Sequence, residues 1–141
     1  MAGLSTAKYV RELPIRATHH PEIMGPIPTL ASDATFGNMG FTTYWEAISK
    51  PFVHATEPHK HDFPQYLFFL GGDPLHLTDL HAEVEINLSL DGKALDKYVF
   101  TKATSIYIPA GLYHNPLLYH KVDRPFIFID LYFSEKYERK A

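Results

Sequence analysis

Alternating apolar and polar residues form the clearest pattern in the chain, and they run from His81 to Leu90. Every second residue from Ala82 to Leu90 is apolar, whereas the positions between them carry histidine, glutamate, asparagine or serine. Because successive side chains of a β-strand point to opposite faces, this pattern predicts a strand with one buried and one polar face. His81 falls on the polar face and is therefore interpreted as a surface residue.

The other apolar stretches are short, and turn residues separate them. Gly71-Gly72 ends one stretch, Asp91-Gly92 is typical of a hairpin, and Pro109 to Gly111 forms a third turn sequence. Helical periodicity is almost absent, so the pattern predicts an all-β sandwich or barrel. Further strands are predicted at residues 41–48, 51–56, 65–70, 98–101, 106–108 and 125–133.

The length of 141 residues indicates a single domain. Residues 1–40 are rich in Pro, Gly, Thr and His, and we expect an extended N-terminal arm that packs on the barrel or on a partner subunit. Residues 41–134 are predicted to form the β-barrel. Residues 135–141 are predicted to form a charged C-terminal tail.

Histidines at two places in the chain suggest a metal site. His59 and His61 are two residues apart, so on a strand they point the same way, and Gln65 shares their parity if the strand continues. His114 follows the Pro109–Gly111 turn on a separate segment. Three imidazoles and one amide oxygen that converge inside a β-structure would bind a divalent transition metal and leave one or two positions open.

Each part of this constellation has a structural alternative. Among nine histidines, one His-x-His pair is expected by chance and would be two surface residues beside an acidic turn. Gln65, at the start of an apolar strand, needs a partner, because a buried unpaired amide costs about 1–3 kcal/mol. That partner is either a metal ion or a neighbouring backbone group. His114 would otherwise be a rim histidine bonded to a carbonyl. Taken together, the two segments favour the metal site.

The two segments resemble the sequence motifs of the cupin superfamily. The first motif reads His-x-His, three or four residues, Glu, six residues, Gly; here it is His59, His61, Gln65 and Gly71. The second contains Pro-x-Gly, two residues and His; here it is Pro109-Ala110-Gly111 followed by His114. The resemblance spans about residues 50 to 133. It implies a double-stranded β-helix, or jelly roll, with one metal ion per chain.

Three positions depart from the cupin motifs. Gln65 replaces the usual glutamate, Ala103 the leading glycine of the second motif, and Leu118 its closing asparagine, with Asn115 nearby. A neutral ligand set leaves the full double positive charge on the metal. This favours Lewis-acid chemistry, or binding of an anionic chelating substrate, over the oxygenase chemistry of the superfamily. Zn, Fe, Ni or Mn would suit the ligands.

Two further residues are candidates for acid–base catalysis. Asp130 is a carboxylate inside the apolar stretch 126–133, where such a group has a buried partner or faces a pocket. His120 lies six residues after His114 and shares its inward face if the strand resumes past Pro116; otherwise it is a surface histidine. His54 is interpreted as an ordinary strand residue, and Asp62 as a solvated turn residue. Several aromatics are candidate pocket or core residues: Tyr44, Trp45, Phe63, Tyr66, Tyr107 and Tyr113.

The composition of the chain argues against nucleic-acid and membrane partners. The net charge is −3 and the chain has no basic stretch, which argues against nucleic acid. No apolar run reaches the length of about 18 residues that a membrane span needs, and we expect no membrane partner. The chain has no cysteine, which excludes thiolate ligands and disulfides. Together with an N-terminus unlike a secretory signal, this predicts a cytoplasmic protein.

Two functions from different classes follow from the sequence. The first is a metal-dependent enzyme that acts on a small chelating organic molecule by isomerisation, cyclisation, decarboxylation or dioxygenation. The alternative is a non-catalytic module that binds a small molecule or a metal. Because jelly rolls expose edge strands that commonly pair, the chain is also expected to form a homodimer.

Overall fold

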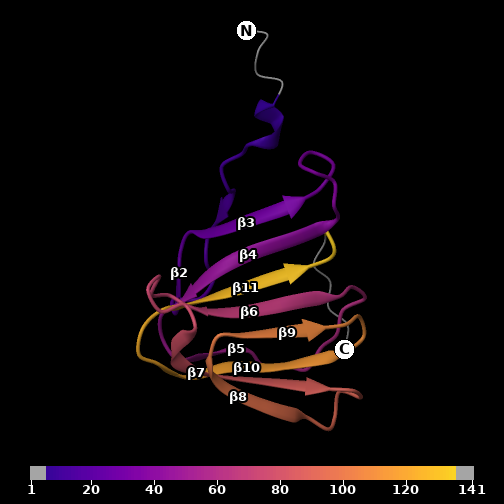
Figure 1. The fold of residues 1–141 in the computed structure, drawn as a ribbon. Coiled ribbons are helices and arrows are strands. Elements are labelled where there is room, and N and C mark those ends of the chain that lie inside the picture. The colour runs from indigo at the N-terminus through magenta and orange to yellow at the C-terminus, as the bar shows by residue number, and fades with distance from the viewer. Residues whose placement is uncertain (1–5, 136–141) are drawn as a thin grey trace.

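A computed structural model describes residues 6–135 as two facing β-sheets that enclose one core (Figure 1). The predicted tail lies outside the described residues apart from Glu135. A single turn of 3-10 helix, η1 (Ala7–Tyr9), precedes the strands. All strand pairings within the described residues are antiparallel, which confirms the prediction of an all-β sandwich.

The larger sheet has the order β1-β3-β4-β11-β6-β9, and β2 also pairs with β4. Its strands are β1 (Ile15–Arg16), β2 (Ile23–Met24), β3 (Ile27–Ser32), β4 (Phe41–Ile48), β6 (Gln65–Gly71), β9 (Thr104–Ile108) and β11 (Phe126–Tyr132). The segment predicted as an arm therefore contributes three strands to this sheet. Ile23 and Ile27 of that segment are buried in the common core.

The smaller sheet has the order β5-β10-β7-β8. Its strands are β5 (Phe52–Ala55), β7 (Asp79–Ser89), β8 (Asp96–Lys102) and β10 (Tyr113–Val122). The predicted Asp91-Gly92 turn joins β7 to β8, and Gly92 adopts a φ of +80°, which glycine reaches without strain. β10 contains register shifts, one of them between His114 and Leu117.

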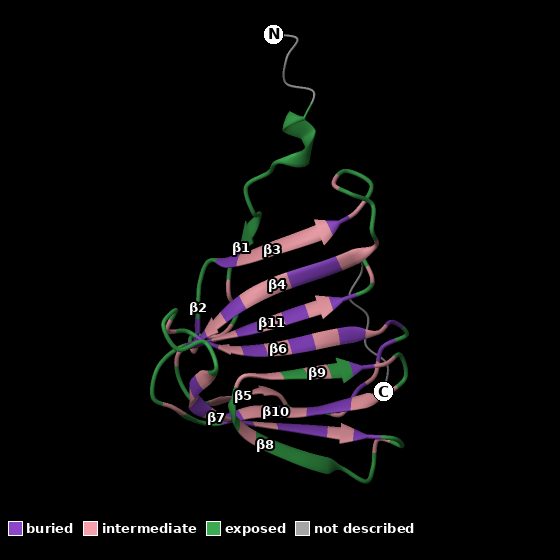
Figure 2. Ribbon diagram, in the orientation of Figure 1, coloured by how far each residue is buried: buried purple, intermediate pink, exposed green. Residues whose placement is uncertain are grey.

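The core lies between the sheets and is built by alternating residues. In β6 and β11 every second side chain is buried, as Figure 2 shows by its alternating bands. Burial of each large apolar side chain contributes about 1.5–3 kcal/mol to folding. The most buried members of the core are Phe69, Phe126, Ile48, Leu80, Val84, Ile86, Ile108 and Tyr119.

The predicted alternation of the 81–90 strand is confirmed as far as Ile86 and fails after it. Asn87 is buried, and Leu90 is 89% exposed in the turn that follows. The irregularity of β10 explains this change, because Asn87 Nδ2 donates a hydrogen bond to the Pro116 carbonyl 3.0 Å away. Asn87 thus turns toward the neighbouring strand, and the alternation of buried apolar and outward polar residues in β7 ends there.

Candidate functional site

The chain brings three buried histidines together from two distant segments. His59 and His114 pair as an isolated antiparallel bridge, in which each backbone N–H donates to the other's carbonyl at 3.1 and 3.0 Å. His61 is anchored by Gly111, whose N–H donates to the His61 carbonyl at 2.9 Å. Gly111 has a φ of +87°, a backbone conformation that suits glycine in the predicted turn. Backbone pairing therefore places all three imidazoles on the same side.

The three rings face one another closely. One ring nitrogen of each residue lies within 4.8 Å of the others. The ring centroids are 4.4 Å apart for His59 and His114, 4.9 Å for His59 and His61, and 5.1 Å for His61 and His114. His61 also stacks on Phe63 at 4.6 Å, which holds its ring in place.

Backbone carbonyls orient two of these rings. Nδ1 of His59 lies 3.3 Å from the Glu57 carbonyl oxygen, and Nδ1 of His114 lies 3.3 Å from the Leu112 carbonyl oxygen. A ring N–H that donates to a carbonyl leaves the opposite nitrogen, Nε2, with its lone pair for a metal. Asn115 Nδ2 lies 3.1 Å from His59 Nδ1, so this amide nitrogen and the Glu57 carbonyl oxygen compete for the same ring nitrogen. The rings are thus held in an orientation that suits metal ligation.

Gln65 begins β6 and is nearly fully buried. Its Nε2 donates to Asp130 Oδ1 at 3.1 Å, and Tyr44 donates to Asp130 Oδ2 at 2.9 Å. Among the residues that the structure describes, Gln65 Oε1 is buried and accepts no hydrogen bond. His59, His114 and Gln65 line the same cavity, and imidazole nitrogens with an amide oxygen fit a divalent transition metal, which takes nitrogen and oxygen ligands. His59, His61 and His114 could hold this ion, and Gln65 is the candidate for a fourth ligand.

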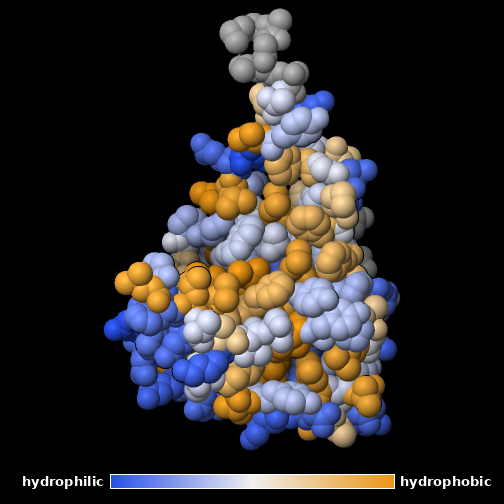
Figure 3. Space-filling model, in the orientation of Figure 1, coloured by the Kyte–Doolittle hydropathy of each residue, from blue (hydrophilic) through white to orange (hydrophobic). Residues whose placement is uncertain are grey.

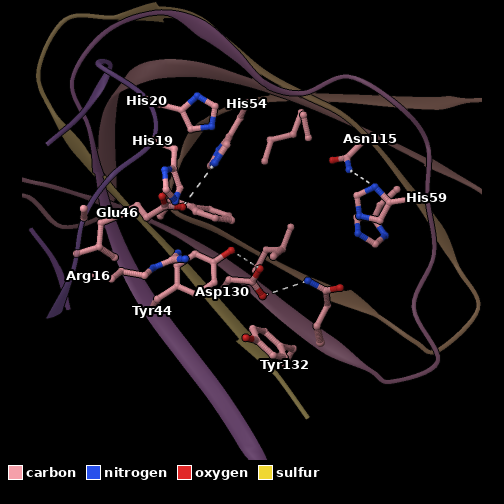
Figure 4. Close-up of a pocket in the computed structure, with 18 residues that line it drawn as sticks. Arg16, His19, His20, Tyr44, Glu46, His54, His59, Asn115, Asp130 and Tyr132 are labelled. Atoms are coloured by element: carbon pink, nitrogen blue, oxygen red, sulfur yellow. Dashed lines mark hydrogen bonds and ion pairs between the residues drawn. The ribbon is translucent and has the colours of Figure 1, made fainter. Parts of the chain in front are cut away.

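A cavity of about 320 Å³ opens beside the histidine cluster, between the two sheets. His59, Gln65 and His114 line it, together with Asn115. Figure 4 places His59 and Asn115 on one side of the cavity and Glu46, His54 and His19 on the other. Such a volume lies at the lower end of the range of ligand pockets, about 300–1,000 Å³, and suits a small molecule.

Two buried carboxyl groups line the same cavity. Burial is the main reason why the pKa of Glu46 is raised to about 7; the Arg16 charge opposes this rise, and a smaller repulsion from Asp130 adds to it. Burial also raises the pKa of Asp130 to about 7, against the hydrogen bonds from Tyr44 and Gln65, which lower it. Carboxyl groups of this kind exchange protons near neutral pH.

The N-terminal segment forms one wall of the cavity. Arg16, Ala17, His19 and His20 line it, and the Arg16 guanidinium lies 4.5 Å from the centre of the Tyr44 ring. His20 packs edge-on against His54, with ring centroids 5.7 Å apart. The end of β1 and the loop between β1 and β2 therefore cover one side of the cavity.

The structure brings together five of the six predicted site residues. His59, His61, His114, Gln65 and Asp130 meet as described, but His120 does not reach the cavity. Its Nε2 lies 2.8 Å from Glu85 Oε1 on an exposed face. The irregularity in β10 changes the strand's parity, so that Leu117 and Tyr119 are buried and His120 points outward.

Glu46 was not predicted as a site residue, and His54 was interpreted as an ordinary strand residue. Glu46 shares the strand parity of the fully buried Ile48, and a carboxylate at such a position was the available signal. His54 carried no comparable signal, because its partners, Glu46 and Tyr119, come from other strands.

Oxalate oxidase and oxalate decarboxylase are among the solved structures that share this architecture. A recombinant oxalate oxidase in complex with glycolate has a TM-score of 0.58 and 16% identity, over 93% of this chain and 61% of that chain. A variant of Bacillus subtilis oxalate decarboxylase has a TM-score of 0.59 and 8% identity, over 90% of this chain and 29% of that chain. Both enzymes are cupins. This chain has the cupin fold.

The chain spans 61% of the oxalate oxidase chain and under a third of the oxalate decarboxylase chains. No protein-family model matches the sequence, and no curated protein does. Within the described part of the chain, no helix is long and apolar enough to span a membrane.

Proposed function

We propose that this cupin chain is a divalent-metal-dependent enzyme that acts on a small chelating organic molecule. The observation that carries the proposal is the meeting of three buried histidines with a cavity that also contains two buried carboxyl groups. A closed structural metal site would have no adjoining cavity, whereas a catalytic site keeps room for substrate. The barrel already has its own apolar core and does not need a metal to form one.

The residues of the site have distinct roles in this proposal. His59, His61 and His114 bind the ion, and Asp130 holds the Gln65 amide by accepting its N–H, so that Oε1 is presented away from Asp130. The bound ion would polarise an oxygen of the substrate as a Lewis acid. Because all four ligands are neutral, none of the charge of the ion is offset, which favours an anionic or enolate-like substrate group. Isomerisation, cyclisation or decarboxylation fits this site better than dioxygenation.

The structural neighbours support a small oxygen-rich substrate. One was solved with glycolate, described as a substrate analogue of oxalate oxidase, and glycolate offers two neighbouring oxygens. Another structural neighbour, Bacillus subtilis oxalate decarboxylase, contains Mn(II) centres. We therefore include manganese with zinc, iron and nickel as candidate ions.

Elemental analysis of the untagged protein tests the metal site. We expect nearly one ion per chain in the wild type, loss of that ion in His59→Ala, and weaker retention in Gln65→Ala. His76→Ala is the matched control, because His76 is an exposed histidine paired with Asp73. Folded wild-type protein that binds none of the supplied ions would refute the proposal.

Turnover distinguishes an enzyme from a binding module. Metal-stripped and metal-restored protein would be incubated with oxalate, glycolate and pyruvate, and the products followed by NMR spectroscopy. We expect chemical change only with metal present. Binding of a probe without chemical change would favour the non-catalytic module instead.

We further propose that the protein forms a homodimer through an exposed strand edge. β8 and β9 are edge strands with exposed apolar side chains, among them Tyr98, Val99 and Tyr107, each about half exposed. Hydrophobic residues gather on the face seen in Figure 3. Edge strands of this kind pair with other chains when nothing covers them. A monomeric mass by light scattering would contradict this proposal.

A further inference from the structure

A carboxyl–imidazole pair, Glu46 and His54, faces the same cavity from two strands that carry none of the metal-site residues. Glu46 lies on β4 with only 5% of its surface exposed, and it lines the cavity. His54 lies on β5, and its Nε2 is 3.5 Å from Glu46 Oε1. In Figure 4 this pair lies across the cavity from His59 and Asn115. The cavity thus has a histidine cluster at one end and a carboxyl–imidazole pair at the other.

Tyr119 contacts the other ring nitrogen of His54. Its hydroxyl lies 2.6 Å from His54 Nδ1. Complete burial raises the pKa of Tyr119 well above its ordinary value, so the hydroxyl keeps its proton and can donate a hydrogen bond to Nδ1. In the tautomer of His54 that accepts this hydrogen bond, the ring proton lies on Nε2, the nitrogen that faces Glu46. The imidazole can thus stabilise the Glu46 carboxylate when it forms.

The groups around Glu46 have opposing effects on its protonation. Burial and Asp130 favour the neutral acid, whereas Arg16 favours the carboxylate. His54 faces Glu46 from β5, and His19 lies beside it at the cavity wall. A carboxyl group with opposing influences of this kind can both accept and return a proton at neutral pH.

We propose that Glu46 is the acid–base residue of this cavity and that the substrate is a small 2-oxo acid or 2-hydroxyketone. This inference rests on the proposed function and names the substrate class for the same site. Such molecules carry two neighbouring oxygens for the histidine end and an acidic C–H bond for the Glu46 end. Their size matches a cavity of about 320 Å³. Arg16 at the wall offers a positive charge to a carboxylate of the substrate.

The proposed step is a proton transfer that needs no oxidant or reductant. The C–H bond next to the substrate carbonyl breaks, its proton goes to a Glu46 carboxylate oxygen, and its electron pair forms the enolate. Glu46 then returns the proton to the same or the neighbouring carbon, which restores the carboxylate. Repetition of this cycle in heavy water exchanges substrate hydrogen for deuterium. Return to the neighbouring carbon of a 2-hydroxyketone, with transfer of its hydroxyl proton to the former carbonyl oxygen, would isomerise it.

The first test measures Glu46 directly and without turnover. The side-chain carboxyl signal of Glu46 would be assigned in carbon NMR spectra of metal-free protein by its loss in Glu46→Gln, and then titrated. We expect its midpoint near pH 7, and a changed midpoint in Tyr119→Phe, which removes the hydroxyl that orients His54. A midpoint at the ordinary glutamate value, about 4.3, would overturn the proposal.

The second test measures exchange of hydrogen in two probes, pyruvate and hydroxyacetone, in heavy water with metal-loaded protein. We expect Glu46→Gln to lower the exchange rate at least about 100-fold, the usual contribution of a positioned acid–base group. Glu83→Gln is the matched control, because Glu83 lies on the outward parity of β7. Unchanged exchange in Glu46→Gln, or no exchange of either probe by the wild type, would overturn the proposal.

Measuring the metal content shows whether a negative exchange result contradicts the substrate and acid–base proposal or the metal-enzyme proposal. Elemental analysis accompanies each exchange measurement. A Glu46→Gln protein that keeps its ion and loses exchange supports the acid–base assignment. Wild-type protein that binds its ion and exchanges neither probe refutes the substrate class alone, whereas wild-type protein that binds no ion refutes the metal enzyme itself.

Discussion

The buried carboxyl group of Glu46 makes the stability of the protein depend on pH in a specific direction. Folding raises its pKa from 4.5 to about 7, chiefly through burial. The folded state therefore holds a proton that the unfolded state has already released. The stability associated with this proton is fully present below about pH 4.5 and is lost as the pH rises through about 7.

The size of the effect follows from the same rise in pKa. A tenfold difference in proton affinity is worth about 1.4 kcal/mol, so the rise for Glu46 amounts to about 3 kcal/mol of unfolding free energy. Glu46→Gln removes the titration and keeps the shape of the side chain. Relative to the wild type, this variant should gain about 3 kcal/mol on going from about pH 5 to about pH 8.

Urea unfolding of metal-free protein at several pH values measures this difference. Asp130 has a raised pKa as well and adds a pH dependence of the same sign to both proteins, so the quantity of interest is the difference between the two curves. Parallel curves for the wild type and Glu46→Gln would refute the reasoning. A difference of opposite sign would mean that Glu46 is a stabilised carboxylate, paired with protonated His54.

Three further outcomes are expected. Phe69→Ala should cost about 3–5 kcal/mol in urea unfolding, because Phe69 is fully buried, whereas the half-exposed Phe133→Ala should cost little. Zinc at about 100 times its dissociation constant should stabilise the wild type by about 3 kcal/mol and leave His114→Ala unchanged in a thermal-shift assay. Gln65→Glu should lower the stability of metal-free protein by about 1–3 kcal/mol, because the hydrogen bond to Asp130 becomes carboxylate repulsion, and added metal should restore it.

Strand parity explains which parts of the fold the sequence could predict. The strand at residues 41–48 was predicted with the bounds of β4, and the hairpin at Asp91-Gly92 lies between β7 and β8. These features depend on local alternation and turn chemistry. The departures occur where strands become irregular, as at Asn115 and Pro116 in β10. An irregularity of that kind shifts every later side chain to the other face, which is why His120 points outward.

The candidate site divides along the same line. His59, His61 and His114 were predictable because imidazoles at motif spacing carry chemical information in the sequence itself. The carboxyl–imidazole pair of Glu46 and His54 was not, because two strands must first be placed side by side before these residues meet. The sequence alone shows which residues could bind a metal. The pair of Glu46 and His54 at the other end of the cavity forms only when the strands pack together.

Residues 16–20 form a wall of the cavity that could determine which molecules bind without taking part in the reaction. All of them except Thr18 line the cavity, but they include none of the histidines of the cluster and neither of the buried carboxyl groups. Substitutions there would reshape this wall while the reactive groups keep their geometry. This short stretch is therefore the natural place for related sequences to diverge in what they admit, and for an engineer to redirect the protein toward a different molecule.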